Sequence, residues 1–286
     1  MRLRHELLAL VVALARPSIL DYPFPRMKVT TWNINGVKAR LESAVAYLRQ
    51  ASPDVICLQE IKSLTEAFPA AAFEDLGYHC AVHGQKGFNG VAILSKLPLE
   101  EMRTGLPGNA ADDQSRFIEA VISVPSGIIK VASIYAPNGN PITTEKFPYK
   151  LAWLGRLREH FRGLLAEEIP FVMAGDYNVI PEPIDAKRPA AWTNDALYQP
   201  ETRAAYRCIL SAGLTDAIRL CHPGPEVYTF WDYQAGAFQK DDGIRIDHLL
   251  LSPQATDRLV AAGVDRFTRA WEKPSDHVPA WVELDV

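Results

Sequence analysis

Carboxylate and amide side chains recur along this sequence at the ends of apolar runs that are typical of β-strands. They are Asn33, Asn35, Glu60, Asp176, Asn178, Asp247 and Asp276, the last followed directly by His277. Oxygen ligands of this kind suit Mg²⁺ and phosphate better than zinc, and the histidine could transfer a proton. The pattern therefore predicts a metal-assisted phosphodiesterase.

Glu60 and Asp176 are the strongest candidates for metal chemistry. Glu60 closes the apolar run Val-Ile-Cys-Leu-Gln, where a solvated charge at a strand edge is the alternative interpretation. Asp176 and Asn178 are two residues apart, which puts both side chains on the same side of an extended segment. Because Mg²⁺ accepts one or two carboxylates and completes its shell with water and phosphate oxygen, we expect Glu60 to be the principal ligand.

His277 lies in a polar turn, Lys-Pro-Ser-Asp-His, that leads into the last expected strand. A catalytic histidine needs an acceptor on its second ring nitrogen to hold one tautomer. Asp247, at the end of Arg-Ile-Asp, is the candidate for that acceptor. The alternative, a histidine that only packs or faces solvent, stays open at this point.

Motifs for other chemistries are missing from the sequence. It has no Gly-x-Ser-x-Gly elbow, P-loop or dinucleotide-binding glycine pattern, which argues against serine catalysis, nucleoside triphosphate use and redox cofactors. The four cysteines lack metal-ligand spacing, so we expect buried free thiols and a reducing, cytoplasmic location. The net charge of −4 does not exclude DNA, because bound metal would offset the site acids while Lys and Arg gather elsewhere.

From residue 27 onward, strand-like runs alternate with helical patterns, which indicates one α/β domain over residues 27–286. The expected strands are 29–33, 55–59, 90–94, 117–124, 129–135, 171–175, 246–251 and 279–283. The expected helices are 41–50, 146–167 and 201–211, the second with Leu151, Leu154, Leu157, Phe161 and Leu165 facing inward. Several strands are too apolar to be half exposed, so we expect two sheets with helices outside them.

Residues 1–26 are expected to form an extension outside the catalytic fold. A basic start, an apolar run from Leu7 to Ala15 and three prolines fit three alternatives: an upstream start codon with Met27 as the natural start, a short amphipathic helix, or an export signal. The apolar run is too short to span a membrane. Within the domain, the polar stretches 137–148 and 181–200 are either binding loops or simple surface loops.

Seven segments, in order along the chain, closely resemble the exonuclease III family of apurinic/apyrimidinic endonucleases. They are WNINGVKAR (32–40), DVICLQE (54–60), HGQKGFNGVA (83–92), GDYNV (175–179), TFWDY (229–233), GIRID (243–247) and EKPSDH (272–277). The resemblance implies a DNase I-like four-layer α/β sandwich, with two packed mixed β-sheets flanked by helices. It also implies a Mg²⁺-dependent DNA-repair enzyme, with Mn²⁺ as an alternative ion, that cuts duplex DNA 5′ to abasic sites and trims 3′ ends.

The resemblance further assigns roles around the metal and the phosphate. It makes Glu60 the principal metal ligand, with Asn33, Asn35, Asp247 and Asp276 around the metal and phosphate. Asp176 is implied to activate the attacking water, and Asn178 to hold the scissile phosphate or that water. His277 is implied to contact the phosphate while paired with Asp247, and the family leaves open whether Asp176 or His277 is the base.

The remaining implied roles concern the substrate, and they are assigned to eight residues. Tyr135 would bind phosphate or assist the leaving oxygen, Asn138 would contact phosphate, the loop residues Lys86, Phe88 and Asn89 would contact DNA, and Phe230, Trp231 and Ile246 would line an abasic-sugar pocket. The alternative for the last three is ordinary core.

Two departures from the family pattern leave open the shape of the abasic pocket and the contact with the complementary DNA strand. They are Ile244, where relatives often have a larger residue, and the loop 138–148. We expect a monomer that acts on double-stranded DNA, not at a membrane. The rival functions are another phosphodiesterase or phosphatase of the same fold, and a non-catalytic nucleic-acid-binding relative.

Overall fold

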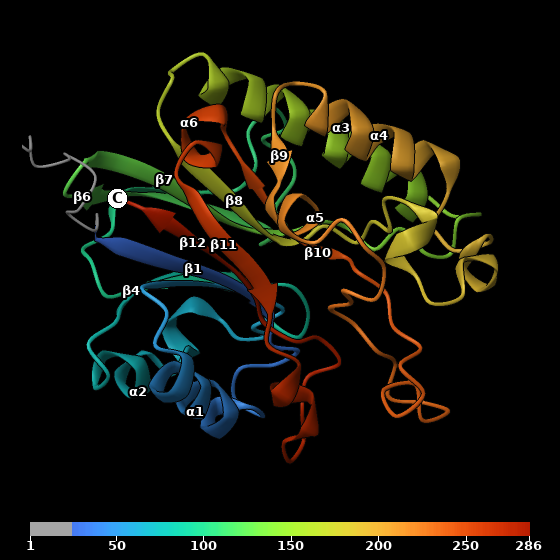
Figure 1. Cartoon of the computed structure of the whole chain (residues 1–286), viewed down its shortest axis with the longest axis horizontal. Coiled ribbons are helices and arrows are strands. Elements are labelled where there is room, and N and C mark those ends of the chain that lie inside the picture. Colours follow the sequence, from blue (N-terminus) through green and yellow to red (C-terminus); the bar gives the residue numbers. More distant parts are fainter. Residues whose placement is uncertain (1–24) are drawn as a thin grey trace, which may run out of the picture.

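The structure, a computed structural model, describes residues 25–286 and contains two six-stranded mixed sheets (Figure 1). The expectations for residues 1–26 lie almost wholly outside the described residues. The first sheet has the order β11-β12-β1-β2-β4-β3. Its strands are β1 (Arg26–Asn33), β2 (Val55–Gln59), β3 (His79–His83), β4 (Val91–Ser95), β11 (Leu259–Val264) and β12 (Ala280–Asp285).

The second sheet has the order β5-β6-β7-β8-β10-β9. Its strands are β5 (Glu100–Thr104), β6 (Phe117–Val124), β7 (Gly127–Tyr135), β8 (Phe171–Asp176), β9 (Thr215–Asp216) and β10 (Asp247–Leu251). Each sheet contains one parallel pair, β1 with β2 and β7 with β8, and all its other pairs are antiparallel. A helix crosses between the strands of each parallel pair, as parallel pairing requires.

Helices cover the outer faces of the two sheets. Below the first sheet in Figure 1 lie α1 (Leu41–Ala51) and α2 (Ala70–Glu74), and above the second lie α3 (Lys146–Leu165) and α4 (Pro200–Leu210). The short helices α5 (Ala217–Cys221) and α6 (Pro253–Thr256) flank β9 and β10 in the chain. The result is a four-layer α/β sandwich, as predicted.

Three apolar cores hold these layers together. The central core lies between the sheets and is built mainly from Val, Ile, Leu and Ala of both, for example Val29, Ile93, Val131 and Leu249. A second core joins the upper sheet to α3 and α4, and a third joins the lower sheet to α1 and α2. Strands buried on both faces explain why their sequences are almost uniformly apolar.

The buried face of α3 differs from the expected one. Leu154, Leu157 and Phe161 face the core as predicted, but Leu151 and Leu165 are only partly buried. The other residues that complete the buried face are Lys150, Trp153 and Leu164. Both the expected and the observed buried face have helical spacing. They share Leu154, Leu157 and Phe161, so these three residues could not decide between the two faces.

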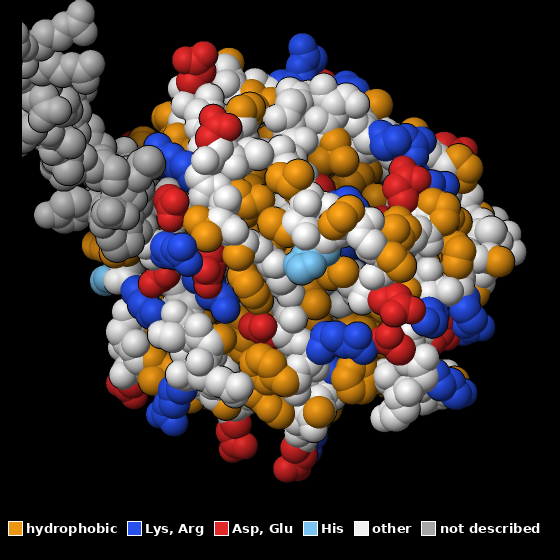
Figure 2. All heavy atoms as spheres, in the orientation of Figure 1, with side chains coloured by type: hydrophobic (Ala, Val, Ile, Leu, Met, Phe, Trp, Pro, Cys, Tyr) orange, Lys and Arg blue, Asp and Glu red, His pale blue; other side chains and the backbone are white. Residues whose placement is uncertain are grey.

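The cysteines and the surface bear on two further expectations. All four cysteines are free, but only Cys57 is buried, and Cys208 and Cys221 are exposed, so the expectation of buried thiols was wrong for these two. Among residues 25–286, no helix combines the length and apolarity needed to cross a membrane. Figure 2 shows basic and acidic side chains interspersed over one face of the molecule.

Candidate active site

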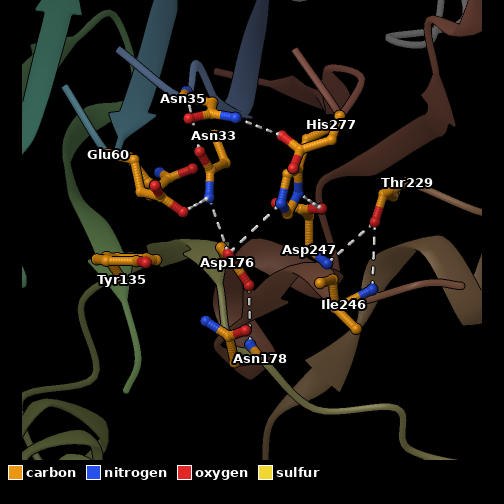
Figure 3. Close-up of polar contacts among 12 residues, drawn as sticks. Asn33, Asn35, Glu60, Tyr135, Asp176, Asn178, Thr229, Ile246, Asp247 and His277 are labelled. Carbon is orange, nitrogen blue, oxygen red and sulfur yellow. Dashed lines mark hydrogen bonds and ion pairs between the residues drawn. The ribbon is translucent and has the colours of Figure 1, made fainter. Parts of the chain in front are cut away.

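The four strands of the two parallel pairs end at one rim of the sandwich, and each delivers a predicted site residue there. Asn33 is the last residue of β1, Glu60 follows β2 directly, Tyr135 ends β7 and Asp176 ends β8. In each pair the strand ends are in register, Asn33 beside Gln59 and Tyr135 beside Asp176. Parallel strands have their carboxyl ends at the same edge, so these side chains gather without any special loop (Figure 3).

Antiparallel strands bring the remaining groups to the same rim. β10 begins with Asp247, which is paired with Asp176 of β8, and its N–H donates to Thr229 Oγ1 at 3.1 Å. His277 precedes β12, which runs antiparallel to β1. Its turn is fixed by Ser275, whose hydroxyl donates to Asn33 O at 2.7 Å and accepts from His277 N at 3.2 Å. Residues 242 positions apart in the sequence therefore meet.

His277 lies between two buried carboxylates. Its Nδ1 is 2.8 Å from Asp247 Oδ2, and its Nε2 is 3.8 Å from Asp176 Oδ2 (Figure 3). All three side chains are almost fully buried. Oxygen or nitrogen atoms of the three lie within 4.8 Å of one another. The Asp247–His277 contact was the pairing expected of a catalytic histidine and its acceptor.

The burial of this trio changes its proton affinities. Burial raises the pKa of Asp176 to about 7, with the Asp247 charge acting in the same direction and His277 opposing it. Burial alone would lower the pKa of His277, but the charge and the hydrogen bond of Asp247 outweigh it and raise that pKa to about 10. The two carboxylates thus stabilise an imidazolium between them.

Glu60 is joined to this trio through Asn33. The Asn33 Nδ2 group donates to Glu60 Oε1 and to Asp176 Oδ2, both at 2.9 Å. On its other side, Glu60 Oε2 is 2.9 Å from the ammonium of Lys62. Burial opposes ionisation of Glu60, but the hydrogen bonds from Asn33 and Lys62 outweigh it and lower the pKa. Sequence reasoning missed Lys62, although a basic residue two positions after a candidate ligand was a usable signal.

Asn35 and Asp276 form the outer part of the same network. Asn35 Nδ2 donates to Asp276 Oδ1 at 3.0 Å, and Asn35 Oδ1 accepts from Lys62 at 2.6 Å. Asn33 Oδ1 in turn accepts from the backbone N–H of Asn35 at 3.1 Å. Hydrogen bonds therefore link Asp276 through Asn35 to Asn33, which contacts Glu60 directly, and the polar atoms of these side chains are largely engaged with one another.

Asn178 contacts Asp176 at Oδ1, the carboxylate oxygen that Asn33 does not bind, and Asn138 contacts Asn178. The Asn178 N–H donates to Asp176 Oδ1 at 2.9 Å, and its Nδ2 donates to Ala136 O at 2.9 Å. Asn138 Nδ2 donates to Asn178 Oδ1 at 3.2 Å. Asn178 has a left-handed φ of 51°, which turns the chain sharply after β8 and keeps its amide at the rim.

Tyr135 borders the same cleft and carries a neighbour that the sequence did not suggest. Burial raises the pKa of Tyr135 well above its usual value, with the Glu60 and Asp176 charges adding to the effect, so its hydroxyl stays protonated as a donor. The Arg116 guanidinium lies 4.9 Å from the centre of its ring. Arg116 directly precedes β6, and no motif in the sequence marked it as a site residue.

A cavity of about 450 Å³ extends from Glu60 and Tyr135 toward the predicted DNA-contact loop. Phe88, Asn89 and Asn138 also line it. Phe88 is 77% exposed, the most exposed large apolar side chain among the described residues. Lys86 is exposed on the same loop, and Asn89 is buried and bonded to Gln85 at 2.8 Å.

The three predicted pocket residues do not stay together. Phe230 packs against a cluster that contains Ile244 and Ile246, and its ring lies 5.1 Å from that of His277. It also lines a second cavity, of about 850 Å³. Trp231 has no exposed surface, belongs to a separate cluster, and donates through Nε1 to Asp241 Oδ1 at 3.2 Å. The assignment of Trp231 to a pocket wall is therefore corrected to a core role.

The donor set at this rim fits a hard divalent cation. The oxygens of Glu60, Asp176 and Asp247 are of the type that such ions prefer. Asp247 Oδ1 is buried and, among the described residues, has no hydrogen-bond partner. A buried carboxylate oxygen without a partner is costly unless something positive faces it. Glu60 stays partly open to the cleft, with a side chain that is 20% exposed.

Comparison with known proteins supports the same interpretation. The sequence model described as the Endonuclease/Exonuclease/phosphatase family matches residues 30–277. The chain belongs to the endonuclease/exonuclease/phosphatase family. Exodeoxyribonuclease III of Haemophilus influenzae is 37% identical over 266 residues, which cover 90% of this chain and all of that protein.

Two solved structures of the family are similar over most of the chain. An AP endonuclease from Archaeoglobus fulgidus has a TM-score of 0.86 at 38% identity, and covers 91% of this chain and 100% of its own. The 3′ phosphatase NExo from Neisseria, bound to a product DNA hairpin, has a TM-score of 0.87 at 38% identity with the same coverage. The protein is thus an exonuclease III-like nuclease of a metal-dependent family, with the DNase I-like fold of that family.

Proposed function

We propose that the protein is a Mg²⁺-dependent DNA-repair nuclease of the cytoplasm, acting as a monomer, that cuts duplex DNA 5′ to abasic sites and removes nucleotides or phosphates from 3′ ends. The observation that carries the proposal is the buried Asp176–His277–Asp247 trio joined to Glu60 by one amide. Residues 27–286 would form the single catalytic domain.

The proposed chemistry is hydrolysis by a water held in line with the scissile phosphate. Glu60 would hold Mg²⁺, or Mn²⁺ in its place, with Asn33, Asn35, Asp247 and Asp276 around it. The ion, when bound, supplies a Lewis acid that neutralises charge growing on the phosphate oxygens.

The protein's own groups would do the rest. Asp176 would take the proton of the water, or His277 would do so after its imidazolium has lost its own proton, and Asp247 would fix the orientation of the imidazole. Asn178 and Asn138 would donate hydrogen bonds to phosphate oxygens, and the protonated Tyr135 hydroxyl would donate to the phosphate or to the leaving oxygen.

The proposed substrate contacts flank this centre on two sides. Phe230 would face the sugar of an extruded abasic nucleotide, whose missing base makes it inexpensive to unstack, and the buried Ile246 would support Phe230 from behind. Lys86, Phe88 and Asn89 would contact the DNA backbone and groove on the side of the 450 Å³ cavity. Relatives that are named as an AP endonuclease and as a 3′ phosphatase support both activities.

One experiment tests the proposal directly. The same preparation is given an abasic duplex, a blunt duplex and a duplex with a 3′-phosphate, with Mg²⁺, with Mn²⁺ and with a chelator. We expect metal-dependent cleavage of the abasic duplex and release from both 3′ ends, and none of these with Asp176→Asn. Failure to cut any duplex, together with hydrolysis of a non-nucleic-acid phosphodiester, would move the protein to another branch of the family.

A further inference from the structure

A fully buried lysine lies directly behind the loops that carry the predicted phosphate contacts. Lys150 is on the inward face of α3 and has 0% exposure. Its Nζ donates to Pro137 O at 2.9 Å and to Asn178 O at 2.6 Å. The first carbonyl directly precedes Asn138, and the second belongs to Asn178 itself.

The chain is shaped to admit this side chain. Gly139 has φ of +90°, and a Cβ added there would lie 2.6 Å from Lys150 Cδ and 3.1 Å from Ala196 Cβ. Both the backbone conformation and the space therefore require glycine at this position. The aliphatic part of Lys150 occupies the space that a side chain at position 139 would need. The loop conformation and the buried lysine therefore depend on each other.

A lysine is an expensive choice for a position that only fills space. Methionine or leucine would pack at this depth without desolvating an amine. Burial lowers the pKa of Lys150 to about 7, with nearby carboxylates opposing the shift. A neutral amine still has two N–H donors, as many as the two carbonyls it meets, so the contact survives loss of the proton.

We propose that Lys150 is a positioning residue for the reaction, which ties the loop after β7 to the loop after β8 and so fixes the amides of Asn138 and Asn178. The two amides are already in contact, since Asn138 Nδ2 donates to Asn178 Oδ1 at 3.2 Å. Without Lys150, two buried carbonyls lose their donor and both loops can shift. The inference rests on the proposed function, in which these amides donate to phosphate.

The test is Lys150→Met, which keeps the volume and removes both donors, assayed on whichever duplex the wild-type enzyme cuts. We expect kcat to fall by about ten- to a hundredfold, the size typical of lost supporting contacts. The KM for DNA and the Mg²⁺ concentration for half-maximal activity should stay within a factor of about three, because the contacts of Glu60 are untouched. Lys130→Met is the matched control, since Lys130 is a partly buried lysine within β7, away from the cleft end of the strand, and is paired with Glu167.

A double-mutant cycle with Asn138→Ala separates positioning from mere support of the fold. If Lys150 acts through Asn138 and Asn178, the double variant loses much less activity than the product of the two single losses. Independent multiplication of the losses, or a wild-type kcat in folded Lys150→Met, overturns the proposal. If Lys150→Met does not fold, Gly139→Ala replaces it in the same cycle, with the same outcomes. An inactive wild-type enzyme would instead refute the proposed function.

Discussion

Replacing Glu60 by glutamine removes one negative charge from the cleft and keeps the shape of the side chain. Glu60 Oε1 accepts from Asn33 Nδ2 and Oε2 lies beside Lys62 Nζ, each at 2.9 Å. Glutamine can keep the first contact through its oxygen, but its NH₂ group then faces the ammonium, and two donors cannot bond. Because the pKa of Glu60 is lowered in the folded protein, the substitution removes a full charge at neutral pH.

The structure separates the effect on stability from the effect on metal binding. The Lys62 and Glu60 side chains are 31% and 20% exposed, so losing their ion pair costs at most about 1 kcal/mol. Losing an anionic group at the metal should weaken Mg²⁺ affinity by about ten- to a hundredfold, equivalent to roughly 1.4–2.8 kcal/mol. Water can take the vacant position, so kcat at saturating Mg²⁺ should recover in part.

The assay is a Mg²⁺ titration of duplex cleavage for the wild-type enzyme, Glu60→Gln and a control. Glu119→Gln is the control, because Glu119 is also buried and paired, with His160 at 2.8 Å, but lies outside the cleft. We expect only Glu60→Gln to shift the half-maximal Mg²⁺ concentration upward, with little change in melting temperature. A lower rate at every Mg²⁺ concentration without that shift would show that Glu60 is not a metal ligand.

Three further predictions follow from the buried polar contacts. Asp247→Asn should lower kcat by about a hundredfold while DNA binding is kept, because His277 loses a charged acceptor at 2.8 Å; a fall in binding alone would contradict this. Arg245→Met should cost about 3–5 kcal/mol of unfolding free energy at pH 7, because Asp216 loses its buried guanidinium partner and Asp185 keeps only Arg219. Burial raises the pKa of both carboxyl groups, but Arg245 outweighs burial, so both pKa values are lowered in the folded protein. The stability that Arg245 contributes is therefore present above about pH 4 and is lost as the pH falls further. Urea unfolding across pH should therefore show the two proteins converging in acid. Trp231→Ala should lower the unfolding free energy by about 3–5 kcal/mol, because Trp231 is fully buried. Measured per folded molecule, abasic incision and 3′-end trimming should fall by the same factor. Unequal losses would show that Trp231 lines the pocket after all.

The inner strands were predictable because burial on both faces leaves a distinct sequence pattern. The predicted 55–59 and 117–124 agree with β2 and β6 to the residue. The four strands that were missed, β3, β5, β9 and β11, are the four edge strands of the two sheets; β5 has no buried residue, and β9 is only two residues long. An exposed edge strand has no apolar alternation to read, and its pairing is decided by the neighbouring strand.

The residues that gather at the candidate site were predictable only where chemistry restricts the residue type. A carboxylate at the end of an apolar strand has few structural uses, so Glu60 and Asp176 could be singled out from the sequence. Trp231 could not, because an aromatic side chain fits a core and a pocket equally well, and only its lack of exposed surface decides between them. Lys150 was overlooked for the opposite reason, since lysine on a helix is normally solvated.

The site exists only as long as the two sheets keep their mutual position. Glu60 and Asn33 come from one sheet, and Asp176 and Asp247 come from the other. The Asn33–Asp176 hydrogen bond crosses between them at the rim. Beneath it a second polar bridge crosses the apolar core, in which Gln59 accepts from Thr31 at 3.1 Å and donates to Ser133 at 2.9 Å.

These bridging residues adjoin site residues in the chain, Gln59 directly before Glu60 and Ser133 two positions before Tyr135. Apolar packing is largely non-directional, so it holds the sheets together without fixing how they slide. Buried hydrogen bonds do fix it, because any slip leaves their donors and acceptors unpaired in the core. The polar bridge thus sets the register between the part of the site on the first sheet, with Glu60 and Asn33, and the part on the second sheet, with Asp176 and Asp247.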